Sequence, residues 1–324
     1  MFLTTHSTNF VDVAEMKNIY LVSRRASTDI QLVNLESAEV VIPRELGVRL
    51  SSFFMFDRLV FVEGLSDESV LREFALSLQT NLGQANVGFV SMGGARNFAY
   101  YATESSLSFL SRRQVRIWFL MDRDERDDDS FSRFFANLKS NAILKVLSRR
   151  ELENYLLCTR AIAQIIKAKR DLAGGTLHAD PPSVAEVQAA LEGNAEALKE
   201  LAISKRVALR VCRPVFPAIK GALEARQGEV STDILRIELQ KMRDSIANQI
   251  SEIDDVYRQE SELVKTKWEE GKLDIFQGDV LLDSVCQQFG VRFVKELDGP
   301  RIAALMTVDE IFDEIRGFLR EVVS

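Results

Sequence analysis

Four short apolar runs alternate with longer amphipathic segments in the first half of this chain. The runs lie at residues 59–62, 87–91, 115–121 and 143–147. Continuous apolar runs of this length are typical of strands buried on both faces of a parallel sheet. Helical periodicity follows the first three runs, at residues 66–79, 97–109 and 130–138. Short strand–helix connections favour right-handed crossovers, so we predict an α/β fold with a central, mostly parallel sheet flanked by helices.

The chain changes character after residue 157. Residues 158–268 show helical periodicity with almost no strand signal, so we predict an all-α helical insertion domain there. Ser183 is expected to cap a helix that stops at Gly193. Residues 231–268 predict one long helix with an apolar stripe. Because the heptad is imperfect, the stripe fits either packing within the chain or the seam of a homodimer.

The two ends of the chain have mixed patterns. Residues 18–23 and 29–35 predict a hairpin, and residues 38–57 link it to the first apolar run. Residues 291–295 predict a strand and residues 308–323 an amphipathic helix, which we expect to complete the sheet. The predicted division is therefore into three parts. These are residues 1–57, residues 58–157 together with 269–324, and residues 158–268.

Composition limits the classes of function. The 324 residues are 46% hydrophobic and 27% charged, which is ordinary for a globular protein. The net charge of −7 means that any contact with nucleic acid must use a local basic surface or bound metal. Three scattered cysteines and two histidines give no zinc-site spacing, and reduced thiols fit a cytoplasmic protein. No signal peptide is evident and no apolar run suits a membrane span.

Acidic pairs follow three of the apolar runs. The pairs are Glu63 with Asp67, Asp122 with Asp124, and Glu151 with Glu153. A single pair is explained as well by acids that cap a helix or lie in a solvated loop. Three pairs, each at the end of an apolar run, are explained poorly in that way. Ligands of open α/β sheets bind at the carboxyl ends of the strands, so all three pairs are expected at one crevice. Carboxylates that lie close together repel one another, and hard divalent cations relieve that repulsion. The pattern therefore predicts a two-metal phosphoryl-transfer site.

Two of these segments resemble a known domain. Val62-Glu63-Gly64-Leu65-Ser66-Asp67 and Met121-Asp122-Arg123-Asp124 resemble the toprim domain of topoisomerases, bacterial primases and some nucleases. Arg150-Glu151-Leu152-Glu153-Asn154-Tyr155-Leu156 is similar to the third motif of overcoming-lysogenization-defect (OLD) nucleases, which join an N-terminal ABC-type ATPase to a toprim nuclease. The opening Leu3-Thr4-Thr5-His6-Ser7 resembles the switch-histidine loop of such an ATPase. The resemblance covers residues 1–157 and, more loosely, 273–324.

The resemblance implies a metal-dependent DNA endonuclease of the OLD class 2 type. Residues 1–57 would be the remnant of the ATPase and a linker, and the ATPase domain itself would be missing. Two Mg²⁺ or Mn²⁺ ions would be held by the six strand-end acids: Glu63, Asp67, Asp122, Asp124, Glu151 and Glu153. Glu63, Asp67 and Asp122 would hold the ion that activates water. Asp124 and the acids at 151–153 would hold the ion that steadies the leaving 3′ oxygen.

Basic residues complete the predicted site. Lys295, at the end of the predicted strand, would stabilise negative charge on the phosphate and so joins Glu63 and Asp122 as a catalytic residue. The chain has Gly278-Asp279 where the family pattern has Gly-Lys. The arginines expected to contact DNA phosphates are Arg96, Arg149 and Arg150.

Two other functions stay open. One is a non-catalytic scaffold that dimerises or binds a partner through the helical insertion. The other is a topoisomerase or primase relative, but Tyr155 fits a packing residue better than a nucleophile. No Gly-x-x-x-x-Gly-Lys-Ser/Thr sequence occurs, so we expect no ATP site in this chain and no role here for His6.

Overall fold

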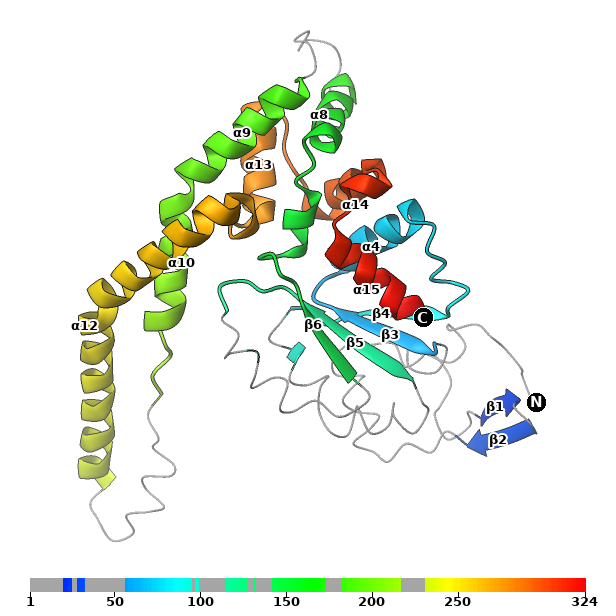
Figure 1. The fold of residues 1–324 in the computed structure, drawn as a ribbon. Helices are drawn as coiled ribbons and strands as arrows, with labels where there is room; N and C mark the ends of the chain where they lie inside the picture. The colour runs from blue at the N-terminus through cyan, green and yellow to red at the C-terminus, as the bar shows by residue number, and fades with distance from the viewer. Residues whose placement is uncertain are drawn as a thin grey trace. The chain divides into compact units, whose positions relative to one another are not determined.

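The chain divides into two compact units in the computed structural model (Figure 1). The first contains Met1–Gln188 and Gly278–Ser324, and the second contains Ala189–Gln277. The described residues are 20–24, 28–32, 56–94, 97–98, 115–126, 131, 142–172, 182–216 and 231–324. The ATPase-like opening, and most of the helices predicted at 97–109 and 130–138, lie outside these ranges.

A four-stranded parallel sheet forms the centre of the first unit, as predicted. Its strands are β3 (Arg58–Val62), β4 (Val87–Ser91), β5 (Arg116–Met121) and β6 (Ala142–Val146). The order is β4-β3-β5-β6, and every neighbouring pair is parallel. The central strands β3 and β5 end side by side, so the acids that follow them are brought to one edge.

Both faces of the central strands are buried, which explains their uninterrupted apolar sequence. Alternate side chains of β3 and β5, including Leu59, Phe61 and Phe119, build one core cluster. The rings of Phe61 and Phe119 stack with their centroids 4.7 Å apart. On the opposite face, Trp118 donates a hydrogen bond of 2.9 Å from Nε1 to the carboxylate of Glu321. This bond attaches the C-terminal helix to the sheet.

Helices cover the face of the sheet that carries Trp118 (Figure 1). The described helices that lie wholly in the first unit, some of them away from the sheet, are α4 (Leu65–Ser77), α8 (Thr159–Leu172), α13 (Gly278–Gln288), α14 (Lys295–Leu305) and α15 (Asp313–Val323). The short 3₁₀ helices are η3 (Leu152–Leu156) and η5 (Val308–Glu310). Helix α14 packs along α4 and also contacts α8 and η3. The segments after residue 277 therefore return to the strand-end acids.

A separate two-stranded antiparallel sheet confirms the predicted hairpin. It pairs β1 (Tyr20–Arg24) with β2 (Thr28–Leu32).

The strand predicted at residues 291–295 is wrong, and the C-terminal region adds helices rather than strands to the sheet. Residues 291–294 belong to no strand, and Lys295 is the first residue of α14. Other groups take the backbone donors that a strand would need. The amide of Phe293 donates to Asp283 at 3.2 Å, and the amide of Val294 donates to Asp298 at 2.7 Å. The alternating apolar residues therefore precede the start of a helix here.

The second unit is helical, as predicted for the insertion. It comprises the C-terminal part of α9 (Val184–Ala197), with α10 (Lys199–Val211), α12 (Ser231–Gly271) and the 3₁₀ helix η4 (Lys272–Asp274). The buried Glu260 joins α12 to α10 through ion pairs of 2.6 Å with Arg206 and 2.7 Å with Arg210. Helix α8, within the range predicted for the insertion, groups with the first unit.

The predicted start of α9 is confirmed, but its predicted end is wrong. The amide of Glu186 donates to Ser183 Oγ, and the Glu186 carboxylate accepts from the Ser183 amide, which is a capping box. The helix continues past Gly193 to Ala197, since an added Cβ at Gly193 meets only open space and nothing there requires a special conformation. Among the described residues, none of the helices combines the length and the apolar character that a membrane crossing needs.

Two glycines in the first unit should respond oppositely to alanine. A Cβ at Gly278 would lie 2.7 Å from the backbone of Glu153 and Asn154, whereas one at Gly317 would meet nothing within 4 Å. We expect Gly278→Ala to lower the free energy of unfolding by roughly 1–3 kcal/mol, because backbone atoms must move. Gly317→Ala should raise it by about 0.5–1 kcal/mol. Urea unfolding measures both, and equal changes in the two variants would refute this account.

Candidate functional site

Glu63 and Asp67 lie where β3 turns into α4. Gly64 is the N-cap of α4, and its amide donates to Asp67 Oδ2 at 2.8 Å. The other oxygen of Asp67 accepts from the Ser66 hydroxyl at 3.2 Å. Glu63 Oε1 accepts from the amide of Asp122 at 3.1 Å, a bond between the ends of β3 and β5. This bond brings the first two predicted acid pairs together.

The acids after β5 face those after β3 and β6. Asp122 Oδ1 accepts from the amide of Leu152 at 3.0 Å, which joins the end of β5 to η3. Asp124 has a positive φ of 49°, a conformation that Asp tolerates better than most residues. Its amide donates to the carbonyl of Arg150 at 2.8 Å, and its carboxylate lies 3.2 Å from Arg126. The three predicted acid pairs therefore surround one strand-end region.

Glu151 and Glu153 are buried, and both depend on the start of α13. Glu151 Oε1 accepts from the amide of Asp279 at 2.9 Å, the second residue of that helix. Helix N-termini offer free amide donors and a partial positive charge, so this position suits a carboxylate. Gly278 permits the approach because any side chain there would overlap Glu153. The Gly-Asp pair thus supports the third acid pair.

Lys295 reaches the cluster from the first turn of α14. Its Nζ lies 2.9 Å from Glu153 Oε1. Burial alone would lower the pKa of Lys295, but the carboxylates of Glu153 and Asp67 outweigh it and raise the pKa. The other oxygen of Glu153, Oε2, is buried and has no hydrogen-bond partner. A buried acceptor without a donor is costly, and a cation would satisfy it.

The predicted DNA-contacting arginines have different surroundings. Arg150 is buried among acids and is bonded to Glu125 and Glu151. Arg149 donates to the carbonyl of Asn154 at 2.9 Å, and its guanidinium lies 3.7 Å from the ring centroid of Phe312. Arg96 lies outside the described residues. The structure therefore brings Arg150 against the acidic side chains of the cluster.

Tyr155 is a packing residue, as its sequence context suggested. Its ring is buried, and its hydroxyl is bonded to the carboxylate of Glu314 on α15 and lies 3.3 Å from Ser148 Oγ. Burial and the bond to Glu314 raise the pKa of Tyr155. A hydroxyl held and protonated in this way is a poor nucleophile, which argues against the topoisomerase reading.

Crowding and burial make the acids hard to ionise. Burial, followed by repulsion from Asp124, raises the pKa of Glu63 to about 7. Burial and repulsion from Glu153 raise the pKa of Glu151 to about 8. The pKa of Asp122 lies well above its ordinary range because of burial and the charges of Asp67 and Glu63. Burial also raises the pKa values of Asp67 and Glu153. The cluster therefore contains more carboxyl groups than its own cations can keep ionised.

The chemistry of these groups suits hard divalent cations. The available ligands are carboxylate oxygens, and one of them, Glu153 Oε2, is buried without a partner. In the described part of the chain, no three acidic, histidine or cysteine side chains already converge on one metal position. Cation binding there would draw these carboxylates further together.

Two contributors to this region were missed in the sequence analysis. Glu125 accepts from Arg150 at 2.6 Å and so orients that side chain. Asp298, nearly fully buried, accepts from the amide of Val294 and fixes the start of α14, from which Lys295 extends. The signal for Asp298 was its place in the first turn of a helix, which the mistaken strand obscured.

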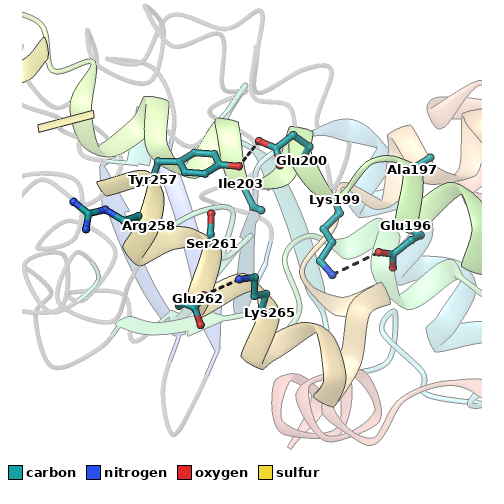
Figure 2. Close-up of a pocket in the computed structure, with 10 residues that line it drawn as sticks. All are labelled: Glu196, Ala197, Lys199, Glu200, Ile203, Tyr257, Arg258, Ser261, Glu262 and Lys265. Carbon is teal, nitrogen blue, oxygen red and sulfur yellow. Dashed lines mark hydrogen bonds and ion pairs between the residues drawn. The ribbon is translucent and has the colours of Figure 1, made fainter. Parts of the chain in front are cut away.

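A cavity of about 610 Å³ lies elsewhere, inside the second unit (Figure 2). Its charged groups largely neutralise one another. Lys265 pairs with Glu262 at 2.7 Å, and Tyr257 donates to Glu200 at 2.8 Å. None of the predicted site residues lines it. The cavity has no surplus charge that would select a ligand.

Stability without metal should fall as pH rises. The pKa values of Glu63 and Glu151, about 7 and about 8, exceed their ordinary value of 4.5, so the folded state holds these protons more tightly than the unfolded chain. That stabilisation is complete below about pH 4.5 and is lost as pH rises through about 7 to 8. We expect the melting temperature in EDTA to drop between about pH 5 and pH 8.5, and Mg²⁺ to restore it.

Glu63→Gln is the matched variant for this measurement. It removes one titrating carboxyl, so its melting temperature should depend less steeply on pH than that of the wild type. A melting temperature that rises over this range in EDTA would contradict the raised pKa values.

Comparison with known proteins gives one family match and one similar solved structure. Residues 54–124 match the family described as "Overcoming lysogenization defect protein-like, TOPRIM domain". A solved structure, the C-terminal region of the Xanthomonas campestris pv. campestris OLD protein, aligns with 13% identity and a TM-score of 0.32. That alignment covers 83% of this chain and 96% of the solved one. No curated protein matches the chain.

The matched segment spans β3, α4, β4 and β5 and includes two of the three strand-end acid pairs, Glu63 with Asp67 and Asp122 with Asp124. The chain therefore contains, across residues 54–124, a toprim domain of the OLD-like family.

Proposed function

We propose that this chain is a metal-dependent DNA endonuclease domain. The observation that carries the proposal is that the three acid pairs and Lys295 lie at one edge of the sheet, in a domain of the OLD-like toprim type. Toprim domains of this family are metal-binding domains of the nuclease type. The finer assignment to phosphodiester cleavage with two ions of Mg²⁺ or Mn²⁺ is ours.

The roles of the residues follow from their positions. Glu63, Asp67 and Asp122 would hold one cation, while Asp124, Glu151 and Glu153 would hold the other. Such ions, when bound, supply an activated water and stabilise the leaving oxygen. Backbone amides of other residues donate to the carboxylates of Glu63, Asp67 and Asp122 and keep them oriented. They leave other lone pairs of each carboxylate for a ligand.

Lys295 would neutralise charge on the scissile phosphate. Its side chain is 35% exposed, and its Nζ is held against Glu153. The surrounding carboxylates keep it protonated, so it can donate to a phosphoryl oxygen throughout the neutral pH range. Arg96 and Arg149 stay candidates for contacts to the DNA backbone. A partner ATPase domain also stays a proposal, because residues 3–7 lie outside the described ranges.

Cleavage of supercoiled plasmid tests the proposal. We expect nicking or linearisation with Mg²⁺ or Mn²⁺ and none with EDTA. Glu63→Gln and Asp122→Asn should each lower the rate by about 10²-fold or more, because each variant removes a ligand charge at the reacting centre. Plasmid that stays intact with every cation would overturn the nuclease assignment.

Glu68→Gln is the matched control for the cleavage experiment. Glu68 lies one residue after Asp67 on α4, but its carboxylate accepts from the outward-facing Arg72 at 2.8 Å. Its rate should stay within about twofold of the wild type, since surface substitutions of this kind change little. An equal loss in Glu68→Gln would show that general charge, and not the cluster, supports cleavage.

A scaffold that dimerises through α12 is the second candidate, because this helix exposes large apolar side chains. Leu239, Ile246 and Ile250 are 58%, 45% and 64% exposed. A row of this kind at helical spacing suits a coiled-coil-like seam between two copies.

Sedimentation velocity tests the scaffold reading. We expect a dimer that Ile250→Asp converts to monomer, because a charge in the seam would be desolvated. Ser251→Asp, one residue further along the same exposed helix, should leave the dimer intact. A wild-type chain that sediments only as monomer, even at about 100 μM, would exclude this seam.

A further inference from the structure

Arg150 lies in the half of the acidic cluster formed by Asp124, Glu125 and Glu151. Its Nε and Nη2 donate to Glu125 at 3.1 and 2.6 Å, and its Nη1 is bonded to Glu151. Nη2 also lies 4.0 Å from Asp124. The side chain is only 6% exposed. A guanidinium fixed by this many acids is a built-in counter-ion and not a loose surface arginine.

The two halves of the cluster are neutralised in different ways. Hydrogen bonds from the amides of Gly64, Asp122 and Leu152 hold the carboxylates of Asp67, Glu63 and Asp122. Amide donors orient a carboxylate without cancelling its charge, and Lys295, whose charge also acts on Asp67, forms its ion pair with Glu153. In the other half, a full positive charge lies directly against Glu151, Glu125 and Asp124. Arg126, at 3.2 Å from Asp124, adds to it.

A guanidinium and a divalent cation cannot share the same carboxylate oxygens without strong repulsion. Arginine stays protonated throughout the accessible pH range, so the competition cannot be relieved by losing a proton. A cation held by Asp124 and Glu151 therefore requires Arg150 to move away from them. The half built from Glu63, Asp67 and Asp122 has no arginine bonded to it among the described residues.

We propose that Arg150 determines how tightly this chain binds a second divalent cation, by competing for Asp124 and Glu151. The inference rests on the proposed function only in taking these acids as cation ligands. It adds to that function a difference in affinity, with one cation bound tightly and the other weakly. Arg150 acts through the carboxylates and is therefore a specificity-determining residue of the centre, with no direct part in bond breaking.

Binding of Mn²⁺ alone tests the proposal, by calorimetry and by the electron paramagnetic resonance signal of free Mn²⁺. We expect the weaker site of Arg150→Gln to bind Mn²⁺ at least about tenfold more tightly than that of the wild type, because a charge within about 4 Å is removed. Arg150→Lys, which keeps the charge but loses the guanidinium's separate donors to Glu125 and Glu151, should fall between the two. Equal or weaker binding in Arg150→Gln would overturn the proposal.

Two controls make the result specific. Arg320→Gln removes the same charge from an exposed position near the end of α15, and should leave Mn²⁺ affinity unchanged. A rise equal to that of Arg150→Gln would also overturn the proposal, since net charge would explain both. If Arg150→Gln unfolds without metal, its melting temperature should rise with Mn²⁺ by more than that of the wild type. A smaller rise would count against the proposal.

The readout separates this proposal from the nuclease assignment. Tighter Mn²⁺ binding in Arg150→Gln, together with uncut plasmid, would support the role of Arg150 and reject the nuclease. Metal-dependent cleavage with unchanged Mn²⁺ affinity in Arg150→Gln would reject only the role of Arg150.

Discussion

Repulsion among carboxylates at the ends of parallel strands is the constraint on which the rest of this structure depends. A parallel sheet delivers the residues after its central strands to one edge, and here those residues are acids. Burial removes the water that would screen them, which is why the pKa of Glu63 rises to about 7. The surrounding elements are arranged to tolerate this charge. They do so with amide donors, internal cations and helix starts.

Three helix starts converge on this edge for that reason. Gly64 is the N-cap of α4 beside Asp67, Gly278 and Asp279 begin α13 beside Glu151, and Lys295 begins α14 beside Glu153. The free amides of a first turn and its partial positive charge favour nearby anions. The segments after residue 277 therefore stabilise acids that come from residues 63–153, although they add no strand to the sheet.

The sequence predicted much of this arrangement because its signals are local. The apolar runs of β3, β4, β5 and β6 and the acids that follow them can be read directly from residues 58–153. The start of α14 could not be read in this way. Val291 to Val294 alternate like a strand, and only the distant side chains of Asp283 and Asp298 take up their amides. The close approach of Gly278 to Glu153 is likewise a tertiary property that a glycine in the sequence does not reveal.

Arg150 shows why a residue type does not fix a role. Its sequence context, a basic pair before a run of acids, suggested a contact to DNA phosphate. The neighbouring Arg149 lies over the ring of Phe312, while Arg150 turns inward to Glu125 and Glu151. Burying an arginine is costly unless acids surround it, and these acids are costly to bury unless a cation accompanies them. The ion pairs between Arg150 and these acids therefore offset the cost of burying both. Without metal, the cluster is therefore stable only to the extent that the protein's own basic side chains balance its carboxylates. A metal ion that binds there has to compete with those basic side chains.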